Sequence, residues 1–245
     1  MRQCLTVDER FRESLTALLP KPPDSAGREA KQHFSQLVSD AAALVLAEEL
    51  TARGLAGTYP AVGVGGRLGA ERRLAGGIGA KRVDVSWATE QSGLLLGLSI
   101  KSINFRDGRS GNFQKNLTNR RGDLLFESVT LHRRFPYAVL GGLLILDSGA
   151  ASDSTERRKS TFENAGYHLR LFRGRRDPAG REEQYEELFV ALFDAEADDP
   201  SVKVYGGADL ATKMSLDAAI SSLIERVAER NSDFYELLDG RLTPR

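Results

Sequence analysis

The sequence is short of cysteine, histidine and long apolar runs, and each shortage excludes a class of protein. Its 245 residues include one cysteine, so no disulfide can form within the chain, which fits a reducing cytoplasm. The three histidines are dispersed and give no zinc-ligand spacing. No apolar run approaches the roughly 18 residues of a membrane span, and the N-terminus lacks the apolar core of a signal peptide. We expect a cytoplasmic protein without a membrane segment.

Three familiar motifs are missing as well. The glycine-rich stretch 59–79 contains neither the phosphate loop G-x-x-x-x-G-K-[ST] nor the dinucleotide fingerprint G-x-G-x-x-G. No G-x-S-x-G elbow occurs, so a hydrolase of that kind has no support. We expect residues 59–79 to form a strand and a flexible connection.

The formal net charge is zero, but the charges are unevenly placed. Apolar residues make up 41% of the chain and charged residues 28%, which suits a soluble globular protein. Residues 101–134 carry eight Lys or Arg against three Asp or Glu, whereas residues 182–199 carry eight acids and no basic residue. A neutral total can therefore hide a local basic surface.

The most informative stretch, residues 81–105, is typical of two strands joined by a tight turn. Apolar and polar residues alternate from 82 to 89, and residues 94–103 are nearly all apolar, as in a buried core strand. Asp84 and Lys101 interrupt this apolar hairpin. Burying an unpaired ammonium is costly, so the two charges either neutralise each other or flank a metal ion and a water molecule.

This arrangement resembles the restriction-endonuclease-like, or PD-(D/E)XK, nuclease superfamily. There an Asp begins one strand of a hairpin, and a (D/E)-X-K triplet lies on the next strand. Asp84 matches the Asp, and Lys101 matches the Lys, 17 positions later. Val83 stands in place of Pro, and Ser99 stands in place of the acidic residue of the triplet. The stretches HRRFPYAVLGGLLIL and GNFQKNLTNRRGDLLFE also resemble bacterial restriction-endonuclease-like proteins.

The order of the expected elements agrees with this resemblance. Hydrophobic periodicity predicts a helix at 29–53, then strands that include the hairpin, a helix ending near 134 and a buried strand at 137–146. We therefore expect an α/β fold with a mixed sheet and the α-β-β-β-α-β core of that superfamily at 29–147.

The remainder of the chain is expected to belong to the same single domain, 1–245. Residues 148–245 would form a largely helical extension that packs on the core. The expected elements outside the core are helices at 11–19, 160–174, 182–195 and 215–230, with Ser215 as N-cap of the last, and a short strand at 202–205.

The resemblance implies a Mg²⁺ site at the hairpin, with Mn²⁺ as an alternative. Asp84 would be the central ligand, and the backbone carbonyl of Ile100 would be another. Lys101 would hold the attacking water and stabilise charge on the phosphate in the transition state. Ser99 would act through its hydroxyl or a bound water.

Ser99 brings no negative charge, so a further carboxylate is expected from elsewhere. Glu48 and Glu49 lie at the edges of the apolar stripe of the helix 29–53, which places them near the hairpin in the element order. We expect one of them to be a metal ligand; the alternative is that both only reach solvent.

A nucleic-acid surface is expected on the helix that ends near residue 134. Lys115, Asn116, Asn119 and Arg120 lie on or beside one face of it, where amide and guanidinium groups suit contacts with phosphates or bases. A solvated helix face would explain the same residues.

Two functions follow from these patterns. The first is a metal-dependent endonuclease that hydrolyses DNA phosphodiester bonds, as a restriction or phage-defence enzyme. The second is a nucleic-acid-binding protein whose nuclease fold has lost catalysis because Ser99 is not acidic. The retained Lys101 favours the first. DNA is the expected partner, and a homodimer is left open.

Overall fold

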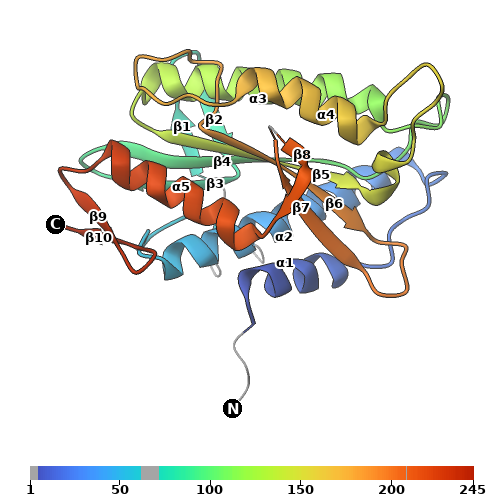
Figure 1. The fold of residues 1–245 in the computed structure, drawn as a ribbon, viewed down its shortest axis with the longest axis horizontal. Helices are drawn as coiled ribbons and strands as arrows, with labels where there is room; N and C mark the ends of the chain where they lie inside the picture. Colours follow the sequence, from blue (N-terminus) through green and yellow to red (C-terminus); the bar gives the residue numbers. More distant parts are fainter. Residues whose placement is uncertain (1–4, 62–71, 208) are drawn as a thin grey trace.

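A six-stranded mixed sheet forms the centre of the computed structural model, which describes residues 5–61, 72–207 and 209–245 (Figure 1). The strands lie in the order β3-β4-β5-β6-β7-β8. β4, β5 and β6 run parallel, and the other neighbours are antiparallel. The strands are β3 (Val85–Thr89), β4 (Gly93–Ile103), β5 (Val139–Asp147), β6 (Glu187–Asp194), β7 (Ser201–Gly206) and β8 (Asp209–Met214). The expected mixed α/β fold is confirmed, and membership in the nuclease superfamily stays a prediction.

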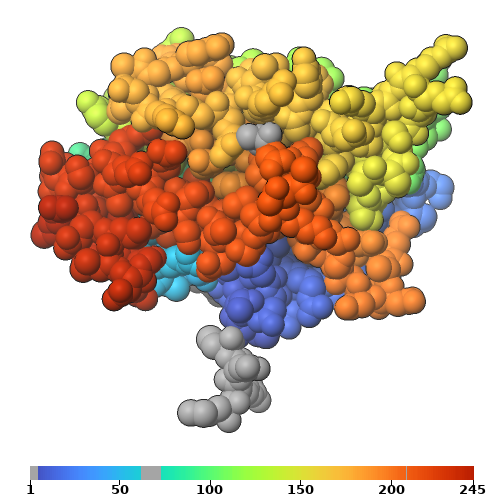
Figure 2. Space-filling view, in the orientation of Figure 1, coloured from blue at the N-terminus to red at the C-terminus, as the bar shows by residue number. Residues whose placement is uncertain are grey.

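Helices cover both faces of this sheet (Figure 1). One face carries α1 (Val7–Thr16), α2 (Arg28–Ala52) and α5 (Leu216–Arg230), and the other carries α3 (Gln114–Arg134) and α4 (Thr161–Leu169). Each face has its own apolar cluster, so β5 is buried at every residue. The carboxyl-terminal segments, orange and red in Figure 2, cover much of the surface seen in that view.

Smaller elements complete the described ranges. They are two short 3₁₀ helices, η1 (Ser148–Ala151) and η2 (Arg170–Phe172), and two small hairpins, β1 (Arg72–Ala75) with β2 (Ala80–Val83) and β9 (Tyr235–Leu238) with β10 (Arg241–Pro244). Residues 62–71 of the glycine-rich stretch, within which a strand and a connection were expected, lie outside the described residues. No helix in the described part of the chain is long and apolar enough to cross a membrane.

Local sequence explains several helix ends. α2 agrees with the predicted helix at 29–53, and it is followed by Gly54, whose φ of 99° is a left-handed conformation that glycine adopts without strain. The side chain of Ser215 accepts the backbone N–H of Ala218, so the predicted N-cap of α5 is confirmed. The expected helix at 160–174 is α4 followed by η2.

The predicted helix at 182–195 is wrong. Residues Glu187–Asp194 form β6, which pairs with β5 on one side and β7 on the other and is buried at all but its last position. An apolar run of this length suits a buried strand as well as a helix, and pairing within the sheet decides for the strand. The expected helical character of residues 148–245 is wrong for the same reason, because β6, β7 and β8 extend the central sheet. The helix expected at 11–19 is α1, which begins and ends earlier.

Candidate active site

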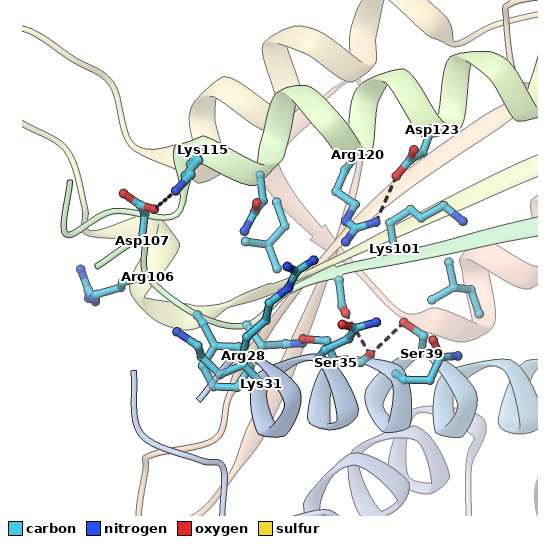
Figure 3. A pocket seen from close by; sticks show the side chains of 18 of the residues that line it. Arg28, Lys31, Ser35, Ser39, Lys101, Arg106, Asp107, Lys115, Arg120 and Asp123 are labelled. Atoms are coloured by element: carbon cyan, nitrogen blue, oxygen red, sulfur yellow. Dashed lines mark hydrogen bonds and ion pairs between the residues drawn. The ribbon is translucent and has the colours of Figure 1, made fainter. Parts of the chain in front are cut away.

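A cavity of about 910 Å³ opens between α2, the carboxyl-terminal part of β4 and α3 (Figure 3). Its lining is mainly polar and comes from three segments of the chain. One wall is the first half of α2, and the opposite wall is α3. The floor is formed by Asp84 and the end of β4 with the loop that follows it. The α2 wall contributes Arg28, Lys31, Gln32, Ser35, Gln36 and Ser39.

Asp84 lies at a bend that separates β2 from β3. The pairing of β3 with β4 ends where Val85 faces Leu98. Beyond that point the Asp84 side chain takes over as a partner of β4, because its Oδ2 accepts the backbone N–H of Ile100 at 2.5 Å. The N–H and the carbonyl of one strand residue point to the same side, so the Ile100 carbonyl is also directed toward Asp84.

Lys101 lies between two carboxylates. Its Nζ is 3.3 Å from Asp84 Oδ2 and 3.1 Å from Oε1 of Glu127 on α3. The same Glu127 oxygen is 3.1 Å from Nζ of Lys81 on β2. The side chains of Lys101 and Glu127 are 13% and 9% exposed, so these charges interact where water screens them weakly. Glu127 of α3 is therefore ion-paired with one lysine near each end of the hairpin, Lys81 and Lys101.

Burial and charge set the protonation of this group. Burial raises the pKa of Asp84, and the Lys101 ammonium only partly offsets this. Burial alone would lower the pKa of Lys101, but the Asp84 and Glu127 carboxylates outweigh burial and raise it. Lys101 therefore keeps its proton at neutral pH and acts as a cation and hydrogen-bond donor.

Glu127 was not among the residues expected at this site. The sequence places it on the polar face of α3, but the contact with Lys101 depends on how that helix is rotated over the sheet. A glutamate that is largely buried on an otherwise polar helix face is a useful signal, and it becomes visible only once the fold is known.

Ser99 does not line the cavity. It lies two residues before Lys101 on the same face of β4, but it is buried beneath α3. Its Oγ is 3.4 Å from the hydroxyl oxygen of Tyr185, which donates a hydrogen bond to the carbonyl of Leu124 at 2.9 Å. The structure thus places Ser99 in the packing between sheet and helix and separates it from the open part of the cavity.

Glu48 and Glu49 are also placed away from the cavity. Glu49 forms ion pairs with Arg10 of α1 and with Arg53, whose Nε lies 2.6 Å from Glu49 Oε1. Glu48 Oε2 is 3.5 Å from Arg10 Nη1. Both acids contact Arg10 of α1, on the side of α2 away from the cavity lining, so the structure does not bring either carboxylate to Asp84.

Three of the four residues expected to contact nucleic acid line the cavity: Lys115, Asn116 and Arg120. Asn119 is exposed and is not part of the lining. Lys115 is paired with Asp107, and Arg120 donates to Asp123 at 3.0 Å (Figure 3).

Arg28 and Lys31, on the α2 wall, were not expected from the sequence. Periodicity marks the polar face of α2, but it does not show that this face lies across a cavity from α3. Figure 3 shows both side chains on the cavity side of α2, with Arg106 from the loop after β4 nearby.

No family model, curated protein or solved structure matches the chain. Among the described residues, no group of three or more His, Cys, Asp and Glu is arranged to hold a metal ion.

Proposed function

We propose that the chain is a metal-dependent endonuclease that hydrolyses DNA phosphodiester bonds and belongs to the restriction-endonuclease-like superfamily. The observation that carries this proposal is the contact of 3.3 Å between Asp84 and Lys101 on the floor of a polar cavity. This contact joins the two residues that match the Asp and the Lys of the PD-(D/E)XK motif. A restriction or phage-defence role rests on the resemblance of the sequence alone.

The donor set at this floor suits a hard divalent cation. Mg²⁺ is commonly bound in proteins through one or two carboxylates, with water and substrate phosphate as its other ligands. Asp84 and the carbonyl of Ile100 would hold it, in line with the 2.5 Å contact that directs the Asp84 carboxylate to Ile100. A bound Mg²⁺ or Mn²⁺ would supply Lewis acidity and lower the pKa of a water ligand.

The chain's own residues provide the rest of the chemistry. Lys101, protonated at neutral pH, would donate to a phosphate oxygen or to the attacking water and stabilise the negative charge that develops. The raised pKa argues against Lys101 as a general base. Asp84 would orient the substrate phosphate through the cation that it holds.

The charges of the cavity suit a polyanion. Among the described residues, six Lys or Arg line it against four Asp or Glu. All four acids have a basic partner within the cavity or beside it. Arg28 and Lys31 are not engaged by those acids, which leaves the α2 wall with positive charge for phosphates. Glutamine and asparagine side chains on both walls can bond to the edges of bases.

A plasmid assay tests this proposal. Supercoiled DNA is incubated with the protein in Mg²⁺, in Mn²⁺ and in EDTA, and nicked or linear product is expected with the metals only. Lys101→Ala should reduce cleavage by a factor of about 100 or more, whereas Lys203→Ala, which removes an exposed lysine from β7, should not change it. Absence of cleavage by the folded wild-type protein on double-stranded and single-stranded DNA would contradict the proposal.

The second candidate is a protein that binds nucleic acid without cleaving it. Ser99 favours this candidate, because it replaces the acidic residue of the (D/E)-X-K triplet and is buried under α3. Binding of DNA that is unchanged by metals, together with no cleavage, would support this candidate.

A further inference from the structure

We infer that Glu127 of α3 supplies the second metal-binding carboxylate of this site. The inference rests on the proposed metal-dependent hydrolysis and adds a residue that the motif does not contain. Glu127 would supply, from α3, the negative charge that an acidic residue at position 99 would otherwise provide.

The position of Lys101 supports this assignment. One ammonium group lies 3.3 Å from Asp84 Oδ2 and 3.1 Å from Glu127 Oε1, so a cationic nitrogen already lies between the two carboxylates. Two oxygens that ligate one Mg²⁺ at about 2.1 Å each lie roughly 3–4 Å apart. To bind one cation, the two side chains would rotate until their oxygens reach that separation, and Lys101 would move toward the cavity, where a phosphate would accept its hydrogen bonds.

The balance of charge leads to the same residue. Glu127 meets both Lys81 and Lys101, so Asp84, Glu127 and the two lysines together are neutral. If Asp84 were the only carboxylate, a divalent cation would enter beside two ammonium groups with one negative charge to hold it. Glu127 lowers the net charge of this group with the cation from about +3 to about +2, and the single negative charge of a phosphodiester would lower it further.

No other described acid fits as well. Glu48 and Glu49 are paired with arginines of α1 and of the C-terminal end of α2, and neither acid lines the cavity. Asp107 is held by Lys115 in the loop after β4. Asp123 lines the same cavity one turn before Glu127, but it faces Arg120 and has no contact with Lys101.

Metal binding without DNA separates this role from a structural one. The measurement is calorimetric titration of Mn²⁺ into the wild-type protein, Asp84→Asn, Glu127→Gln and the control Asp123→Asn. We expect the affinity to fall about 10- to 100-fold in Glu127→Gln and at least as far in Asp84→Asn. Asp123→Asn should bind Mn²⁺ like the wild type.

A purely structural Glu127 gives a different result. Glu127→Gln would then lower the melting temperature in EDTA, while the increase produced by Mn²⁺ would equal that of the wild type, and the inference would be overturned. A wild-type protein that binds no metal would overturn the proposed function together with the inference. If Asp84→Asn loses metal binding and Glu127→Gln does not, Glu127 is not a metal ligand, and the proposed function still stands.

A measurement on the wild-type protein covers the case in which Glu127→Gln does not fold. Carboxylate ¹³C resonances are recorded while diamagnetic Mg²⁺ is added to saturation. Changes in the chemical shifts of Glu127 and Asp84 together, with Asp123 little affected, are the expected result. A Glu127 signal that keeps its shift while the Asp84 signal moves would refute the assignment.

Discussion

Oδ2 of Asp84 contacts both the backbone N–H of Ile100, at 2.5 Å, and the ammonium of Lys101, at 3.3 Å. The bend at Asp84 and the two consecutive residues of β4 are thus linked through a single carboxylate oxygen. The same side chain that ends the pairing of β3 with β4 orients the lysine.

Asp84 and Lys101 should therefore be separable by what each variant loses. Asp84→Ala removes the central ligand, so Mn²⁺ binding and plasmid cleavage should both disappear. Lys101→Ala should reduce cleavage by a factor of about 100 or more, as for removal of a group that stabilises transition-state charge, while metal binding is kept. Calorimetry and the plasmid assay measure the two effects. Full activity in Lys101→Ala would exclude the mechanism.

Much of this site was predictable because its two central residues violate a strong rule. A lysine in a nearly continuous apolar strand needs a partner, and the hairpin supplies one acid on the adjacent strand. The α5 helix was predictable for a local reason as well, since Ser215 and the apolar spacing after it mark its start.

The missed features depend on contacts between distant segments. The apolar run of β6 fits a helix as well as a strand, and only its pairing with β5 and β7 decides for the strand. The contact of Glu127 with Lys101 depends on the rotation of α3. The acids of α2 were expected at the site because the docking of α1, which brings Arg10 to Glu49, is not visible in the sequence.

The pair Glu48→Gln and Glu49→Gln should affect stability and spare metal binding. Glu49 is largely buried and holds arginines from α1 and from the end of α2, so loss of its charge should destabilise the fold by about 1–3 kcal/mol. For a chain of this size that is a melting temperature lower by roughly 2–4 °C per kcal/mol. Thermal melting and Mn²⁺ titration test this. A clear drop in metal affinity would show that Glu48 or Glu49 is a metal ligand after all.

Acid stability should depend on Glu186, which is fully buried. Burial opposes its ionisation, but His132 at 3.3 Å and the Arg230 guanidinium at 2.6 Å outweigh it and lower the pKa of Glu186. Because the folded-state pKa lies below the unfolded value of about 4.5, this stabilisation is present above that pH and is lost as pH falls through the folded value.

Glu186→Gln should therefore weaken the protein at neutral pH more than in acid. The variant leaves Arg175 and Arg230 buried without their carboxylate, which should cost about 3–5 kcal/mol. Urea unfolding of both proteins at pH 7 and near pH 3 measures the difference. An equal loss at both pH values would show that shape, and not charge, is what Glu186 contributes.

Both walls of the cavity should contribute to the binding of DNA. The test is the slope of log K against log salt, measured in Ca²⁺ or EDTA to prevent cleavage. Each lost phosphate contact should reduce the slope by about 0.9 on duplex DNA. We expect a reduction of one to two contacts for Arg28→Ala with Lys31→Ala, since neither side chain is held by an acid of the cavity.

The opposite wall provides the comparison. Lys115→Ala with Arg120→Ala should also flatten the slope, and it should weaken binding further because Asp107 and Asp123 are left facing the DNA without their partners. The matched control is Lys203→Ala with Arg226→Ala, which removes one lysine and one arginine outside the cavity. A flattened slope for the α3 pair only would confine DNA to that helix. Equal slopes in all three double variants would mean that the cavity does not bind the DNA backbone.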